Sequence, residues 1–230
     1  MQRLKAKLER NVFRDFTDEE AEQIKLVQAH QETLIATAQP LTELLVCMAR
    51  NGVTVVGQSI GSNAQAGLSD PMLQEIRANG GCMLIHNHPS EGSLSYDDWN
   101  LVAGNPGIDE IVAINSSGSI FRGRALANAR TSLKAKVKTG DVAPDVGQAA
   151  LEPLWKAFNV ALQEQTEMTD PTGLEKLLSW VWSHLVNEQL KALGLVEYEA
   201  TLSETDGATL SHSSYAPIIA AGQTEVKKRV

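Results

Sequence analysis

The sequence is poor in cysteine and has no long apolar run. Cys47 and Cys82 lack the spacing of a zinc-ligand pair and fall in stretches expected to be buried strands. We therefore expect both to be small core residues in a reducing compartment. No apolar run of about 18 residues is present, so no membrane span is expected. Residues 1–10 lack the apolar segment of a signal peptide, which favours a cytoplasmic protein and leaves secretion as an effector or toxin open.

Basic residues are also in deficit. The chain has 20 Lys and Arg against 28 Asp and Glu, and its net charge of −8 makes nucleic-acid binding an unlikely function. The hydrophobic share of 43% and the charged share of 21% are ordinary for a soluble globular protein. A chain of 230 residues can form one core of about 100–150 residues with extensions.

Residues 86–89, His-Asn-His-Pro, carry the clearest functional signal. They follow a short apolar stretch with glycines at its start, residues 80–85, which is typical of a buried strand. Side chains at i and i+2 of an extended segment point to the same side, so the imidazoles of His86 and His88 converge. Asp98 offers a carboxylate ten residues after His88. Two nitrogens, one oxygen and an open fourth position are typical of a catalytic zinc site, and we expect one Zn²⁺ per chain.

This pattern, with Ser95-Tyr-Asp-Asp98 downstream, resembles that of the JAMM/MPN+ (JAB-domain) zinc metalloproteases. The resemblance is closest to bacterial members, including the RadC-like branch, and covers about half of the chain. It implies that His86, His88 and Asp98 bind zinc and that Ser95 is catalytic, helping to hold an oxyanion. Six residues separate His88 from Ser95, where seven are commonest in the family, which leaves Asp97 as an alternative ligand.

The family's upstream glutamate, the expected general base, has two candidates. Glu43 opens an apolar stretch that precedes Asn51-Gly52, a turn signal between two strands. Glu32 lies in residues 18–38, whose composition is helical and which contain no turn signal. The position of the family's glutamate at the start of a hairpin favours Glu43 as an outer-shell base that moves a proton without binding the metal.

The order of expected elements predicts an α+β fold, and the resemblance implies a JAB/MPN-like small curved sheet flanked by helices. We expect four parts, with the last mainly helical: an N-terminal helical segment (1–38), the metalloprotease core (39–125), a basic linker (126–150) and a C-terminal region (151–230). Within the core, Asp70-Pro71 predicts a helix start, Gly80-Gly81 its end, and Ser95 the cap of the next helix. Two strands are expected to follow, from Glu110 and from Ser119.

The C-terminal half is less informative. Residues 151–165 and 174–193 predict amphipathic helices, and residues 203–214, with Asp206-Gly207, predict a polar hairpin. The tryptophans are expected in the core or as docking anchors, and the histidines as structural or surface residues: Trp155, Trp180, Trp182, His184 and His212. Residues 122–138 carry six Lys and Arg and no acid, which favours a solvated helix face and linker over a contact for an acidic partner.

The resemblance implies a zinc-dependent peptidase that hydrolyses an amide or isopeptide bond. The resemblance implies a protein or peptide substrate, with ubiquitin-like conjugates favoured, and we expect the strand before His86 and the loop 89–94 to pair with it. A partner protein could bind through the C-terminal helices. The alternatives are a non-catalytic JAB-scaffold interaction module, a peptidoglycan-peptide hydrolase or toxin domain, and, least favoured, a DNA-associated protein.

Overall fold

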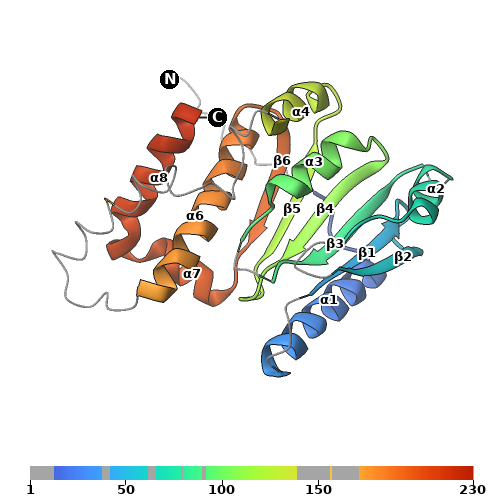
Figure 1. Ribbon diagram of the computed structural model, residues 1–230, viewed down its shortest axis with the longest axis horizontal. Coiled ribbons are helices and arrows are strands. Elements are labelled where there is room, and N and C mark those ends of the chain that lie inside the picture. The colour runs from blue at the N-terminus through green and yellow to red at the C-terminus, as the bar shows by residue number, and fades with distance from the viewer. Residues whose placement is uncertain are drawn as a thin grey trace, which may run out of the picture.

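The computed structural model describes residues 13–37, 42–61, 66–78, 80–89, 92–138, 156 and 171–229. Within them the chain forms an α+β fold in which helices flank a single mixed sheet (Figure 1). The strands are β1 (Glu43–Ala49), β2 (Val55–Gly61), β3 (Cys82–Asn87), β4 (Ile108–Ile114), β5 (Ile120–Ala125) and β6 (Val196–Thr201). The α-helices are α1 (Asp18–Thr37), α2 (Asp70–Ala78), α3 (Tyr96–Gly104), α4 (Arg130–Lys138), α6 (Pro171–Ala192), α7 (Glu204–Ser211) and α8 (Ala216–Arg229).

The sheet runs in the order β2-β1-β3-β4-β5-β6. Only β3 and β4 are parallel, and the other neighbouring strands pair antiparallel. Because β3 pairs with β1 on one side and β4 on the other, it has no free edge. The expectation that the strand before His86 pairs with a substrate chain is therefore wrong: among the described strands, the free edges belong to β2 and β6.

The two faces of the sheet are covered by different helices. On β3, Met83 and Ile85 face α1, where they pack with Ile24 and Val27. Leu84 belongs to the larger core on the other face, which includes side chains of α2, α3, α4 and α6 (Figure 1). This alternation follows from the two-residue period of a strand, and it places consecutive residues of the His-Asn-His segment on opposite faces.

Local signals in the sequence define the elements around the site correctly. Asn51 Oδ1 accepts hydrogen bonds from the backbone N–H of Val53 (2.9 Å) and Thr54 (3.1 Å), and Gly52 adopts a φ of 69°, so the predicted turn joins β1 to β2. Helix α2 begins at Asp70, and the N–H of Gly81 bonds to Ile76 O (3.2 Å) as the helix ends. The turn and the extent of α2 are thus confirmed, but the cap residue is Ser69 and not Asp70, because Ser69 Oγ accepts from Met72 N (3.4 Å).

The C-terminal region departs from expectation in two elements. Strand β6, which was not predicted from the sequence, pairs with β5 in the same sheet. The predicted polar hairpin at residues 203–214 is wrong, because α7 fills most of that stretch. Ser203 is the N-cap of α7, and its side chain accepts from Asp206 N at 3.2 Å. The buried Asp206 carboxylate then accepts from Asn115, Ser117 and Ser119, which fixes α7 to the β4–β5 turn.

The three arginines in the basic stretch all make contacts within the fold, although only Arg122 is buried. Arg122 is buried and paired with Glu110 (2.6 Å), and Arg124 pairs with Glu197. Arg130 donates to backbone carbonyls at the end of α3 and the start of β4, including that of Ile108 (2.9 Å). Residues 130–138, within the expected linker, form α4, whose Leu133 is buried in the core. The structure therefore uses these arginines for packing.

Other predictions in this half have mixed outcomes. Helix α6 matches the predicted helix at 174–193, whereas the helix predicted at 151–165 and Trp155 lie outside the described residues. Trp180 and Trp182 are buried in the core, as are Cys47 and Cys82, which are free thiols. Within the described part of the chain, no helix is long and apolar enough to cross a membrane.

Candidate metal centre

His86 and His88 lie at the end of β3, the strand between β1 and β4. His86 is the partner of Leu45 on β1 and of Ala113 on β4, so its backbone is held on both sides. His88 N–H continues the pairing by donating to Ile114 O at 2.7 Å. Their ring Nε2 atoms lie 3.0 Å apart, and both side chains are buried. The predicted convergence of the two imidazoles is confirmed.

Helix α3 places Asp98 against both imidazoles. Ser95 is the N-cap of α3 in a capping box: its Oγ accepts from Asp98 N (3.2 Å), and Asp98 Oδ2 accepts from Ser95 N (2.6 Å). Ser95 Oγ also donates to Asp98 Oδ2 at 2.8 Å. Asp97, the alternative ligand, is exposed, whereas Asp98 is buried in the cluster. The structure thus favours Asp98.

The three side chains are close enough to bind one metal ion. Asp98 Oδ1 lies 3.0 Å from His86 Nε2, and Asp98 Oδ2 lies 3.1 Å from His88 Nε2. Vertices of a tetrahedron with bonds of 2.0–2.1 Å are about 3.3 Å apart, so small shifts would bring three donor atoms around one ion. Since Ser95 already occupies Oδ2, Oδ1 is the oxygen better placed to act as a ligand.

The site concentrates opposite charges when no ion is bound. Burial opposes charge on His88, but the Asp98 carboxylate outweighs this and raises the pKa of His88 to about 9. Burial likewise disfavours the Asp98 anion, but the two imidazoles outweigh it and hold the pKa of Asp98 well below its ordinary value. The cluster therefore has an anionic oxygen ready for a cation, while His88 must lose a proton before it can bind a metal.

Glu43 lies beside this cluster without joining it. Its Oε1 is 4.0 Å from His86 Nε2. Burial raises the pKa of Glu43 above its ordinary value, although the neighbouring imidazoles act in the opposite direction. Glu32, the rival candidate, is exposed on α1. The arrangement fits an outer-shell carboxylate rather than a fourth ligand.

Asn87, between the two histidines, holds the backbone on both sides of Glu43. Its Oδ1 accepts from Leu44 N (2.7 Å), and its Nδ2 donates to Thr42 O (3.0 Å) and to Gln31 Oε1 on α1 (2.5 Å). Asn87 and Gln31 are both buried. This role of Asn87 was not predicted from the sequence, because its signal is a single polar residue on the α1 face of a buried strand.

The second ring nitrogens differ in their surroundings. His88 Nδ1 lies 3.2 Å from Gly92 O, an acceptor that would fix the tautomer in which Nε2 is free for a metal. His86 Nδ1 is buried and has no hydrogen-bond partner among the described residues. Two of the expected ligands therefore have a neighbouring group that orients them: Gly92 O for His88, and Ser95 for Asp98. The contact of Gly92 O could not be predicted from the sequence.

No protein-family model, no curated protein and no solved structure matches the chain.

Proposed function

We propose that the protein is a zinc-dependent peptidase that hydrolyses an amide or isopeptide bond in a protein substrate. The observation that carries the proposal is a buried His-His-Asp cluster with a separate carboxylate, Glu43, 4.0 Å from one of the imidazoles. Metal-dependent hydrolysis needs both parts: ligands that leave a coordination position open and a base that is not a ligand. The resemblance of the motif to the JAMM/MPN+ family supports the same assignment, and we propose a JAB/MPN-like core.

Zinc fits these donor atoms better than magnesium or calcium does. Two imidazole nitrogens and one carboxylate oxygen suit zinc, whereas magnesium and calcium prefer oxygen donors. When bound, zinc lowers the pKa of water from about 16 toward about 7 and polarises a carbonyl group. His86, His88 and Asp98 would hold it, and Ser95 would keep the Asp98 carboxylate in place.

Glu43 would move the proton in this reaction. Its raised pKa brings the carboxylate closer to the range in which it can accept a proton from water and pass it to the leaving amine. Ser95 is the expected oxyanion donor, but its hydroxyl is bonded to Asp98. We therefore assign Ser95 first to positioning Asp98, and its direct contact with a substrate oxygen stays a prediction.

The free edge of β2 is a better candidate than β3 for pairing with an extended substrate, because β3 is paired on both sides. Gly61, at the end of β2, is the register partner of Glu43, so this edge leads toward the proposed base. Ile60 and Val55 on β2 are exposed, at 67% and 40%. Backbone pairing with a free strand is a general way to bind an extended chain. We propose a protein or peptide substrate with small residues at the scissile bond, and favour a ubiquitin-like C-terminus.

The Glu43→Gln variant tests the proposal. It should still bind one equivalent of zinc, since the ligands remain, while turnover falls by at least about a hundredfold because the proton carrier is lost. Glu32→Gln is the matched control and should retain wild-type turnover, since its side chain is exposed on α1. Zinc content and cleavage would be measured with ubiquitin chains, a peptide library and peptidoglycan fragments.

Each other outcome rejects a defined part of the proposal. Near-normal turnover in Glu43→Gln would remove Glu43 from the base role. Cleavage confined to peptidoglycan peptides would overturn the ubiquitin-like preference. A wild type that binds zinc but cleaves nothing would favour the non-catalytic interaction module, and a salt-dependent shift of DNA would favour the DNA-associated alternative.

A further inference from the structure

The short segment 92–95 orients two of the proposed metal ligands. At its start, Gly92 O lies 3.2 Å from His88 Nδ1. At its end, Ser95 binds Asp98 Oδ2 through both its backbone N–H and its hydroxyl. A shift of this segment would therefore move the outer partners of His88 and Asp98 together. What holds the segment in place affects the geometry of the whole cluster.

Helix α6, from the C-terminal region, binds the two residues in the middle of this segment. Ser183 Oγ accepts from Ser93 N at 3.0 Å, and Asn187 Nδ2 donates to Ser93 Oγ and to Leu94 O, each at 3.0 Å. Asn187 Oδ1 accepts from Trp99 Nε1 on α3 at 2.7 Å. All of these side chains are buried. Buried polar groups without partners are costly, so each bond favours one position of the segment.

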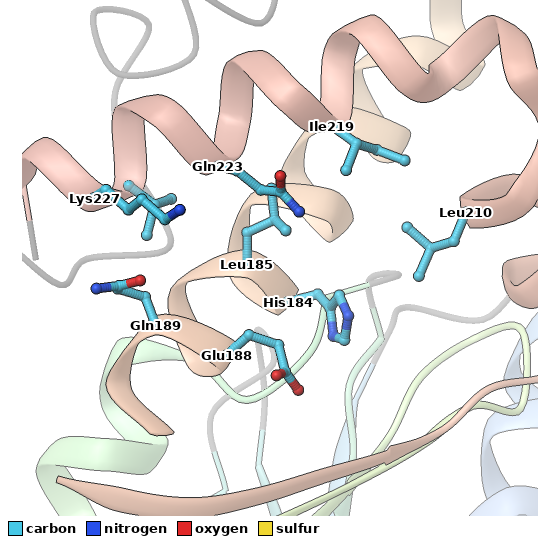
Figure 2. Close-up of a pocket in the computed structure, with 9 residues that line it drawn as sticks. His184, Leu185, Glu188, Gln189, Leu210, Ile219, Gln223 and Lys227 are labelled. Carbon is cyan, nitrogen blue, oxygen red and sulfur yellow. The ribbon is translucent and has the colours of Figure 1, made fainter. Parts of the chain in front are cut away.

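The same network reaches β6 and the outer side of α6. Tyr198 Oη lies 2.7 Å from Ser93 Oγ and 2.9 Å from His184 Nδ1. His184 lies on the wall of a cavity of about 490 Å³ between α6, α7 and α8, which Figure 2 shows with Gln189 and Gln223 also at its walls. Gln189 thus lines this cavity, whereas Asn187, two residues earlier on α6, binds the ligand segment. This difference supplies a matched control.

From these contacts we propose that α6 is a positioning element of the metal centre, with Asn187 and Ser183 as positioning residues. They hold Ser93 and Leu94, and through them they keep Gly92 against His88 and Ser95 against Asp98. The inference rests on the proposed metal site. It gives the C-terminal region a role inside the centre that is separate from any partner or substrate it binds.

Zinc affinity and local hydrogen exchange together test this inference. In Asn187→Ala, the dissociation constant for Zn²⁺, measured by competition with a chromophoric chelator, should rise about tenfold, as for loss of an outer-shell partner. In the zinc-free protein, the amides of Ser93 and Asp98 should exchange about tenfold faster, while those of β4 remain slow. Gln189→Ala should match the wild type in both measurements.

Failure of this inference can be distinguished from misfolding of a variant and from failure of the proposed function. If Asn187→Ala does not fold, Ser183→Ala, which removes one bond to Ser93, decides the matter through the same two measurements. A folded variant with wild-type zinc affinity and wild-type exchange at Ser93 and Asp98 would overturn the inference. If the wild type binds no zinc, the proposed function fails, and the exchange experiment still decides whether α6 holds the segment.

Discussion

At the scale of single residues, the candidate site depends on side chains outside the expected ligand set. Asn87 lies between two expected ligands, and its amide bonds to the residues before and after Glu43. The sequence predicted that His86, His88, Asp98 and Glu43 lie close together, as the structure places them, because the motif and the strand signals are local. It did not identify the function of Asn87, because hydrogen bonds to residues more than forty positions away depend on the folded arrangement.

Replacing Asn87 should separate zinc binding from hydrolysis. Asn87→Ser leaves the buried Leu44 N–H and Thr42 O without their amide partner, so we expect the free energy of unfolding to fall by about 2 kcal/mol. Zinc affinity should change less than about threefold, because the ligands remain, while turnover falls about tenfold as Glu43 loses its fixed position. Denaturant unfolding, zinc competition and kinetics check this. Equal losses in zinc affinity and turnover would show that Asn87 positions the metal ligands and not Glu43.

The charge on His88 predicts how zinc binding depends on pH. The pKa of about 9 means that His88 is protonated at pH 7.5, so zinc must displace that proton, whereas Asp98 is already ionised. Zinc affinity should therefore rise about tenfold per pH unit between about pH 7 and pH 9 and level off above that. Calorimetry in buffers of different ionisation enthalpy should show about one proton released at pH 7.5. A pH-independent affinity would contradict this assignment.

At the scale of elements, β5 and α3 fit together only because β5 contains a glycine. A Cβ on Gly123 would lie 2.4 Å from Leu94 Cδ1 and 2.6 Å from Trp99 Cη2, both of them fully buried. Leu94 belongs to the segment held by α6, so the sheet contributes to the same positioning. The close approach could not be predicted from sequence, since a glycine within a strand does not say which side chain lies over it.

Gly123→Ala should therefore destabilise the protein and disturb the centre. We expect a loss of about 1–3 kcal/mol in the free energy of unfolding, typical of overpacking in a core, and weaker zinc binding as Leu94 shifts. Gly104→Ala is the control, because its added Cβ meets nothing within 4 Å at the exposed end of α3. Unchanged stability in Gly123→Ala would show that Leu94 and Trp99 are less constrained than the structure implies.

Element prediction failed where the decisive contacts were distant or a signal was overlooked. In β6, Val196 and Tyr198 alternate with glutamates, a strand pattern whose partner β5 lies far earlier in the chain. Helix α7 is preceded by the cap Ser203 in Ser203-Glu-Thr-Asp206, the same Ser-x-x-Asp pattern as Ser95-Tyr-Asp-Asp98, but Asp206-Gly207 was interpreted as a turn. The cap was therefore the stronger local signal.

At the scale of the whole molecule, the C-terminal region is part of the structure around the site. Strand β6 extends the sheet, and α6 contributes Trp180, Trp182 and Val186 to the larger core. A chain that ends at residue 138 should therefore fail to unfold cooperatively and should not bind zinc stoichiometrically, because these buried contacts are lost. Calorimetry and zinc titration of the shortened chain check this. A shortened chain that is stable and binds zinc would show that the fold and the site do not need the region after residue 138.

The central claim is one zinc ion held by His86, His88 and Asp98, with Glu43 outside the ligand set. Crystals grown with zinc and measured on both sides of the zinc absorption edge test it most directly. We predict one anomalous peak per chain, about 2.0–2.2 Å from both Nε2 atoms and one Asp98 oxygen, with the Glu43 carboxylate beyond ligand distance. Absence of a peak at this cluster, or a peak with Glu43 or Asp97 as a direct ligand, would contradict the account.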